Sequence, residues 1–224
     1  MTGPLALVGG DEWNDGCSFD RGLLEVSGSR EVVVIPAAAA YIRPQRAIER
    51  ARAWFDQLGA TVVAPPVLLR PDAADETSVS IIRNARFVYL TDGSSMHLRS
   101  VLKDTPVFDA LMEAWRGGAV LAGSGAGADV LCDPMVDPRG GAFTVGLGVL
   151  PGLAVIPRFD TWSREKVHRT VELAPSGVTV AGVSLRTALL RDGEGHWRCE
   201  GVGEVAVWVD GQPTELSALD ALTA

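Results

Sequence analysis

The ten residues 120–129, Val-Leu-Ala-Gly-Ser-Gly-Ala-Gly-Ala-Asp, limit most narrowly how this chain can fold. A short apolar run ends in a turn of small residues and continues into a segment that is compatible with a helix. This pattern is typical of a nucleophile elbow, the sharp strand–turn–helix junction whose apex carries a serine or cysteine. The apex residue here is Gly125. Because glycine adopts the strained apex conformation without steric penalty, we expect a positive φ angle at Gly125.

Apolar runs alternate with helical patterns along the rest of the chain, which predicts an α/β fold with a mostly parallel sheet between helices. The length of 224 residues suits a single domain that spans residues 1–224. The string Asp-Gly-Glu-Gly at 192–195 predicts a hairpin turn in the C-terminal region. The predicted strands are 5–8, 31–36, 61–64, 87–90, 119–122, 153–156, 178–183, 187–191, 197–200 and 205–209; the predicted helices are 47–58, 75–84, 96–102, 107–115 and 164–173; a loop is predicted at 133–148, and a short or frayed helix at 216–224.

The composition argues against several classes of protein. Hydrophobic residues make up 47% of the chain, which is enough for a substantial core and argues against disorder. A formal net charge of −8 does not fit the basic face of a nucleic-acid-binding protein. No apolar stretch is long enough to span a bilayer, and the N-terminus lacks the regions of a signal peptide. The sequence therefore predicts neither a nucleic-acid partner nor a membrane partner.

The cysteines and histidines do not form a metal-binding pattern. Cys17, Cys132 and Cys199 are far apart and odd in number, so we expect reduced thiols in a cytoplasmic protein. None of the three histidines has ligand spacing with cysteine, aspartate or glutamate. The glycines of the elbow also lack the spacing of a nucleotide-binding loop. We therefore expect no metal and no cofactor.

Four strings of this sequence resemble the cyanophycinase and aspartyl dipeptidase family of serine peptidases, and the match covers nearly the whole chain. Leu7–Gly10 is similar to the family's opening strand and turn. Leu90–Leu98 resembles its T-G-G-D/N-Q-x-x-L segment, which helps to build the oxyanion hole and substrate pocket. Ala122–Ala128 resembles A-G-T-S-A-G-A, and Gly146–Gly152 resembles G-L-G-L-L-P-G. The resemblance implies the class I glutamine amidotransferase-like fold, a flavodoxin-like three-layer α/β/α sandwich, here with a C-terminal β-hairpin region.

The chain departs from this family at the positions that would carry the chemistry. The resemblance places Gly125 at the nucleophilic serine, Arg158 at the general-base histidine and Leu185 at the third, acidic member. Ser95 stands at the glutamine of the pocket segment. Glycine has no nucleophile, an arginine side chain stays protonated at neutral pH, and leucine cannot orient a base by charge. No member of the triad is intact, so the sequence predicts that serine-peptidase activity has been lost.

Three interpretations of the function remain open, the third being a purely structural or scaffolding subunit. In the first, the protein is a non-catalytic homologue that binds a small acidic or peptide ligand or acts through protein contacts, with a homodimer left open. In the second, it is an active serine-type hydrolase of aspartyl peptides or cyanophycin-like substrates. The second interpretation requires a nucleophile relocated to Ser124, Ser95 or Cys132. We expect Ser124 to be a cap or turn hydroxyl, because it precedes the apex.

The sequence also predicts a pocket around the elbow. A helix that begins near Gly125 would direct free N–H groups into it, and Arg158 would add a positive charge. These groups would form an anion pocket for a carboxylate or phosphate. An internal ion pair of Arg158, for example with Asp160 or Asp129, would exclude this pocket. The pocket residues predicted in this way are Gly93, Ser94, Ser95, Ser124, Gly125, Ala126 and Arg158.

Overall fold

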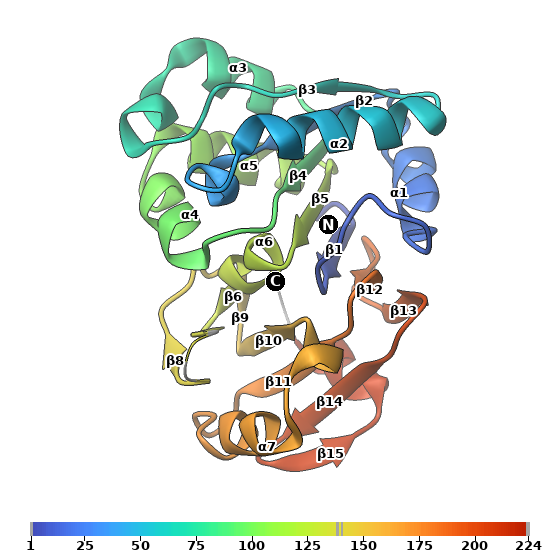
Figure 1. Cartoon of the computed structure of the whole chain (residues 1–224), viewed down its shortest axis with the longest axis vertical. Coiled ribbons are helices and arrows are strands. Elements are labelled where there is room, and N and C mark those ends of the chain that lie inside the picture. Colours follow the sequence, from blue (N-terminus) through green and yellow to red (C-terminus); the bar gives the residue numbers. More distant parts are fainter. Residues whose placement is uncertain (1, 138, 140, 223–224) are drawn as a thin grey trace.

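The computed structural model describes residues 2–137, 139 and 141–222, and a seven-stranded sheet lies at its centre (Figure 1). In spatial order, the strands are β13 (Trp197–Gly201), β12 (Thr187–Arg191), β1 (Leu5–Val8), β5 (Val120–Ser124), β4 (Phe87–Leu90), β2 (Glu31–Ile35) and β3 (Thr61–Val63). The strands from β1 to β3 in this order run parallel to one another. β12 and β13 extend the sheet in antiparallel pairing. The prediction of a mostly parallel α/β sheet is confirmed.

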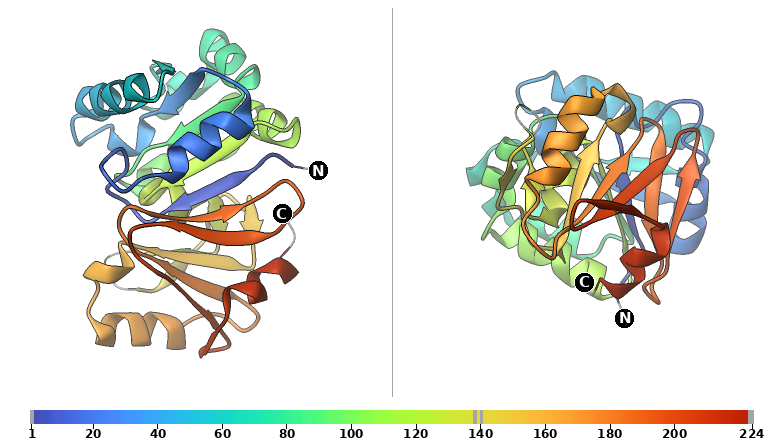
Figure 2. Two further views of the ribbon diagram at one scale, coloured as in Figure 1. Left: turned by 90° about the vertical axis from the view of Figure 1, so that its right-hand side faces the viewer. Right: turned by 90° about the horizontal axis from the view of Figure 1, so that it is seen from below.

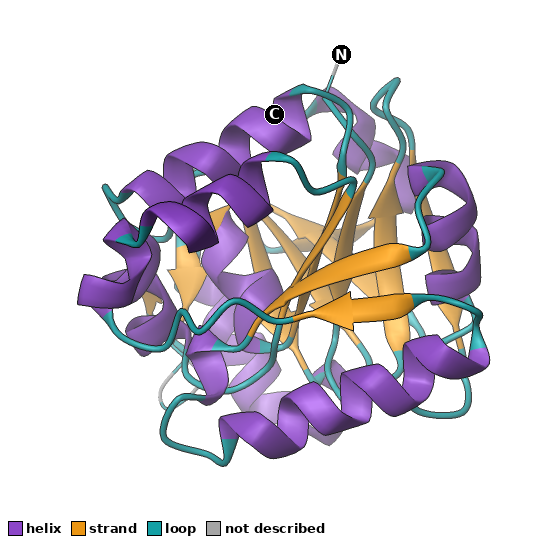
Figure 3. Ribbon diagram, turned by 90° about the horizontal axis from the view of Figure 1, so that it is seen from above, coloured by secondary structure: helices purple, strands orange, loops and turns teal. Residues whose placement is uncertain are grey.

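Helices cover both faces of this sheet, as Figure 3 shows. Along β1 the side chains alternate between the two faces: Ala6 and Val8 belong to one buried cluster, and Leu5 and Leu7 to another. The helices that complete the first cluster are α1 (Phe19–Ser27) and α2 (Pro44–Gln57); those that complete the second are α3 (Glu76–Arg83), α4 (Ser95–Leu102), α5 (Pro106–Arg116) and α6 (Ala126–Leu131). The two cores give the three layers that the family resemblance implies.

A second sheet, which the sequence analysis did not separate from the first, lies below it in the left view of Figure 2. Its strands are, in order, β10 (Leu153–Pro157), β11 (Thr179–Val183), β14 (Val205–Val209) and β15 (Gln212–Thr214). The helix α7 (Arg164–Glu172) packs on one face, where Val171 joins a small core with Ile156 and Val180. The other face contributes Val155, Val183 and further residues to a core that it shares with the central sheet. The two sheets are therefore joined by one hydrophobic cluster.

The remaining elements are short. The segment predicted as a loop at 133–148 contains two-residue strands, and the terminal segment predicted as a short or frayed helix forms a 3-10 helix within its described part. The short strands are β6 (Cys132–Asp133), β7 (Met135–Val136), β8 (Phe143–Thr144) and β9 (Leu150–Pro151); the 3-10 helices are η1 (Ala37–Ala39), η2 (Arg70–Ala74), η3 (Phe159–Thr161) and η4 (Leu216–Ala221).

Local sequence explains where most of the helices begin. Asp75 and Thr105 accept backbone hydrogen bonds as the N-caps of α3 and α5. Pro106 occupies the first turn of α5, as predicted. α2 begins at Pro44, three residues before the predicted start at Ala47, because a proline is also well suited to a first helical position. No helix among the described residues is long and apolar enough to cross a membrane.

Candidate functional site

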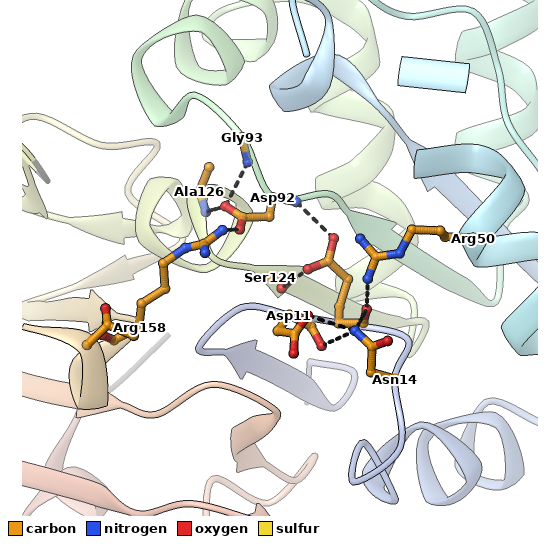
Figure 4. A network of polar contacts seen from close by, with 10 residues as sticks. Asp11, Asn14, Arg50, Asp92, Gly93, Ser124, Ala126 and Arg158 are labelled. Carbon is orange, nitrogen blue, oxygen red and sulfur yellow. Dashed lines mark hydrogen bonds and ion pairs between the residues drawn. The ribbon is translucent and has the colours of Figure 1, made fainter. Parts of the chain in front are cut away.

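The candidate site lies where the carboxyl ends of parallel strands meet. β1, β5 and β4 are neighbours and end at Val8, Ser124 and Leu90, so the residues that follow them lie along one edge of the sheet. The second sheet meets this edge, because the N–H of Arg158, directly after β10, donates to the carbonyl of Gly9 at 2.7 Å. Side chains from four strand ends are thereby brought together (Figure 4).

Gly125 forms the sharp turn that the sequence predicts. Its φ and ψ angles are 50° and −107°, and it connects β5 directly to α6. Its N–H donates to the carbonyl of Val8 on the neighbouring strand at 2.8 Å. The positive φ is confirmed, and with it the elbow as a piece of architecture.

The Asp92 carboxylate occupies the space in front of this elbow. Asp92 follows β4, and its Oδ1 accepts the N–H of Gly93 at 2.7 Å and the N–H of Ala126, the first residue of α6, at 2.9 Å. Its Oδ2 forms an ion pair with the guanidinium of Arg158 (Figure 4). A Cβ atom added to Gly125 would overlap with the Asp92 carboxyl group. Asp92 therefore fills the volume that a serine side chain at the apex would need.

This arrangement corrects the predicted anion pocket. Arg158 and the first N–H of α6 do converge, but the anion that they share is the protein's own Asp92 side chain. The Arg158 side chain is half exposed, whereas that of Asp92 is only 15% exposed. An internal ion pair of Arg158, which excludes such a pocket, is present, although its partner is Asp92 instead of Asp160 or Asp129. The prediction that Arg158 and the start of α6 form an anion pocket is therefore wrong.

The two carboxylates that had been considered as partners of Arg158 have other roles. Asp160 accepts the N–H of Leu185 at 2.9 Å. Asp129 is buried on α6, and its Oδ1 accepts the N–H of Val136 at 2.8 Å. Burial raises the pKa of Asp129 to about 7, and a hydrogen bond from Ser95 opposes that increase.

Arg158 and Leu185 lie close together beside the elbow. A Cβ atom added to Gly10 would be 3.2 Å from Cγ of Arg158 and 3.3 Å from Cδ2 of Leu185. Arg158 in turn contacts Asp92, which abuts Gly125. The structure thus brings Gly125, Arg158 and Leu185 to one place, while their equivalence to the members of a catalytic triad stays a prediction.

Ser124 hydrogen-bonds to a buried carboxyl group that the sequence analysis did not identify. Its hydroxyl is fully buried and donates to Oε2 of Glu12 at 2.8 Å. Glu12 is itself only 4% exposed, and the N–H of Asp92 lies 3.5 Å from its Oε1. Burial, and then the negative charge of Asp92, raise the pKa of Glu12. The interpretation of Ser124 as a simple turn or cap hydroxyl is therefore wrong: it is part of a buried polar network.

The other two candidates for a relocated nucleophile are also held by internal contacts. Ser95, at the start of α4, is buried and hydrogen-bonds to Asp129. Cys132 is fully buried, and burial raises the pKa of its thiol well above the usual range. A cysteine with a raised pKa is mostly in the thiol form, which is the poorer nucleophile.

The three histidines lie elsewhere. The ring of His97 contacts the carbonyl of Leu68 through Nε2 at 2.8 Å. His196 faces Asp192 beside the hairpin turn, and His168 is exposed on α7. No group of three or more histidine, cysteine, aspartate or glutamate side chains in the described part of the chain is arranged to hold a metal ion.

A cleft of about 750 Å³ opens beside the elbow. Of the predicted pocket residues, Gly93 and Arg158 line it, together with Asp92 and Glu12. Ser94 and Ser95 line a separate depression of about 290 Å³, which also reaches Gly93. Ser124, Gly125 and Ala126 line neither of the two. The predicted pocket is therefore divided, and the cleft continues along α2.

Sequence reasoning missed Asp92 and Glu12, and only one of them left a signal. Asp92 stands where the T-G-G string of the family segment has its first glycine. This chain therefore has a larger residue than the family string at position 92 and a smaller one, glycine instead of serine, at position 125. Glu12 carries no such signal, because its partner Ser124 is 112 positions away.

Comparison with known proteins confirms the family resemblance. Residues 6–196 match the model of Peptidase family S51. A cyanophycinase from Trichormus variabilis is 28% identical over 204 residues, which cover 85% of this chain and 63% of that protein. A cyanophycinase from Synechococcus elongatus is 26% identical over 149 residues, 62% of this chain and 46% of that protein. The chain thus spans less than two thirds of the length of these curated relatives.

Two solved structures are similar to this one. A peptidase from an acI-B1 actinobacterium has a TM-score of 0.86 and 28% sequence identity, over 96% of this chain and 93% of that chain. A putative peptidase E from Listeria monocytogenes EGD-e has a TM-score of 0.69 and 18% identity, over 91% of this chain and 100% of that chain. The second likeness supports the fold alone.

Proposed function

Since this chain belongs to peptidase family S51, we propose that it keeps the family's cleft as a binding site for a small acidic or peptide ligand and does not perform serine-peptidase chemistry there. The observation that carries the proposal is the position of Asp92. Its carboxylate occupies the volume of an apex side chain and accepts the N–H of Ala126 at the start of α6.

The chemistry of the three converging residues supports the same conclusion. A serine peptidase needs a nucleophile, a base that takes its proton and a carboxylate that orients the base. Gly125 offers no nucleophilic atom, and Leu185 offers no charge. Arg158 offers a guanidinium group, which is a hydrogen-bond donor without an acceptor site, and that group already binds Asp92. Binding without turnover is the function that these side chains can perform.

One observation favours a second candidate function, an active hydrolase. Ser124 donates a hydrogen bond to Glu12, which resembles the pairing of a nucleophile with a general base. Its full burial opposes this function, because a nucleophile must reach the substrate. Substrate access would require movement of the residues around β5 and Glu12.

Assays with aspartyl dipeptides, cyanophycin and chromogenic esters are expected to show no turnover above the uncatalysed rate, because the candidate nucleophiles Ser95, Ser124 and Cys132 are buried. Ser124→Ala is expected to leave that background unchanged. Ser100→Ala, which removes an exposed hydroxyl on α4, is the matched control. Turnover by the wild type that Ser124→Ala abolishes, while Ser100→Ala retains it, would establish the hydrolase instead.

A screen for metabolites that raise the melting temperature separates ligand binding from a purely scaffolding role. Selective binding to the native state raises the apparent stability in proportion to RT ln(1 + [L]/Kd). We expect acidic small molecules or short peptides to produce this shift. A flat screen together with a stable complex with another protein would favour the scaffolding role.

A further inference from the structure

The wall of the cleft that α2 provides carries a row of arginines. Arg43, the N-cap residue of α2, and Arg46 and Arg50, within the helix, all line the cleft. Residues three and four apart lie on the same helix face, which accounts for their common direction. This wall is distinct from the elbow, where Arg158 is already paired with Asp92.

The negative charges that line the cleft are taken up internally. Asp92 binds Arg158, and Asp11 lies 3.6 Å from Nε of Arg186. Glu12 is buried and accepts the hydroxyl of Ser124. An incoming cation would therefore have to displace an existing partner.

The arginines of the α2 wall have fewer internal partners than the carboxylates of the cleft. Among the described residues, neither Arg43 nor Arg46 has a hydrogen bond or ion pair through its side chain, and both are exposed. Arg50 donates to the backbone carbonyl of Glu12 at 2.6 Å, which leaves its charge without a carboxylate partner at hydrogen-bond distance. The chain has a net charge of −8, so this row of guanidinium groups makes one wall of the cleft positive in a protein that is negative as a whole.

The backbone fixes part of this wall. Arg43 has a φ of 56°, a left-handed conformation that side chains larger than glycine rarely adopt. Pro44 follows it and fixes the start of the helix, and the N–H of Arg46 donates to the carbonyl of Arg43 at 3.0 Å, so the two backbone positions are held relative to each other. Exposed Ile42 lines the same cleft and offers an apolar contact next to the charges.

We propose that Arg43 and Arg46, with Arg50 behind them, bind the anionic end of a small ligand, a carboxylate or a phosphate group, whose remaining part lies along the cleft toward Ile42 and Gly93. The inference rests on the proposed function, since it describes the ligand of the same cleft. A guanidinium group binds carboxylate and phosphate through paired hydrogen bonds, and it is less strongly hydrated than an ammonium group. The volume of about 750 Å³ is that of a small-molecule site.

The test compares the double variant Arg43→Gln with Arg46→Gln against a double variant of equal charge. Arg52→Gln on α2 with Arg116→Gln on α5 is the control, because both arginines are exposed and neither lines the cleft. Isothermal titration calorimetry uses succinate and inorganic phosphate as probes, with succinamide as the neutral analogue. Glutamine removes the charge and, like arginine, favours a helix, and the melting temperature checks that each variant folds.

We expect saturable binding of at least one anion to the wild type at millimolar concentration, and none of succinamide. The Arg43→Gln, Arg46→Gln variant should bind at least about tenfold more weakly, as expected for the loss of charge-assisted hydrogen bonds. The control variant should match the wild type. Preference for succinate identifies a carboxylate ligand, and preference for phosphate identifies a phosphorylated one. No binding to the wild type, or equal weakening in both variants, overturns the proposal.

The same preparations distinguish failure of this inference from failure of the proposed function. Hydrolysis of the dipeptide panel by the wild type would contradict the proposed function whatever the calorimetry shows. If that hydrolysis had a raised KM with an unchanged kcat in the Arg43→Gln, Arg46→Gln variant, the anion site would stand and only the absence of turnover would be wrong.

Discussion

Replacement of Gly125 by serine is expected to lower the free energy of unfolding by about 3 kcal/mol, through backbone strain and overpacking, without creating peptidase activity. The φ of 50° and ψ of −107° are strained for a serine. The new Cβ would also overlap with the Asp92 carboxyl group. Arg158 and Leu185 remain unchanged and supply neither a base nor a carboxylate, so the added hydroxyl stays unactivated. Urea unfolding and the substrate panel measure the two effects.

A double-mutant cycle separates the overlap from the strain. In an Asp92→Ala background, the Gly125→Ser penalty should be smaller by at least about 1 kcal/mol, because the two side chains no longer compete for one volume. Gly59→Ser is the control for a side chain at positive φ without overlap, since Gly59 has a φ of 77° and nothing within 4 Å of an added Cβ. An additive cycle, with the same penalty in both backgrounds, would contradict the position of Asp92 described above.

Asp129→Asn is expected to remove a pH dependence of stability that the wild type shows between about pH 4 and pH 7. Burial raises the pKa of Asp129 from its ordinary value of 3.8 to about 7, so the folded state holds this proton more tightly than the unfolded chain does. The contribution of Asp129 to stability is therefore fully present below about pH 4 and is lost as the pH rises through this window, by up to about 4 kcal/mol. Asparagine keeps an acceptor for the N–H of Val136 and carries no charge. The measurement is the difference in unfolding free energy between variant and wild type across this range.

Asp75→Asn provides the contrast in sign. Hydrogen bonds from Ser78 lower the pKa of Asp75 at the N-cap of α3. Its contribution to stability is present above its ordinary pKa and is lost as the pH falls, which is the opposite of Asp129. The difference curve for Asp75→Asn should therefore slope in the other direction. Parallel stability curves for the wild type and Asp129→Asn would show that Asp129 does not titrate as described.

Local patterns were sufficient for most of the central sheet. The continuous apolar run at 31–36 and the helical spacing before Gly59 correspond to β2 and α2 with shifts of one to three residues at their ends. α1 was missed. It contains Gly22, and its stability comes from the burial of Phe19, Leu23 and Leu24 against the sheet, which is a tertiary effect.

Long-range pairing could not be read from the pattern. The strands β10, β11 and β14 were anticipated and β15 was not, and because apolar periodicity gives no information about partners, none of them was assigned to a second sheet. Contacts within the candidate site could not be predicted from local patterns either. The motif resemblance identified Gly125, Arg158 and Leu185, whereas the contacts of Asp92 with Ala126 and Arg158 join strand ends that are 34 and 66 residues apart. A prediction of free charge at Arg158 failed for that reason.

The shared volume of residues 92 and 125 also determines which single substitutions are accessible to this protein. A side chain at the apex is accommodated only after position 92 has become small, and that earlier change leaves Arg158 without its carboxylate. The intermediate on such a route is less stable and gains no activity, so the two positions are epistatic. A random library with one substitution per clone would therefore contain the change at position 92 and the change at position 125 only separately, and neither alone would give activity. Simultaneous variation of 92, 125 and 158 is the smallest search in which a new activity at the elbow could be selected.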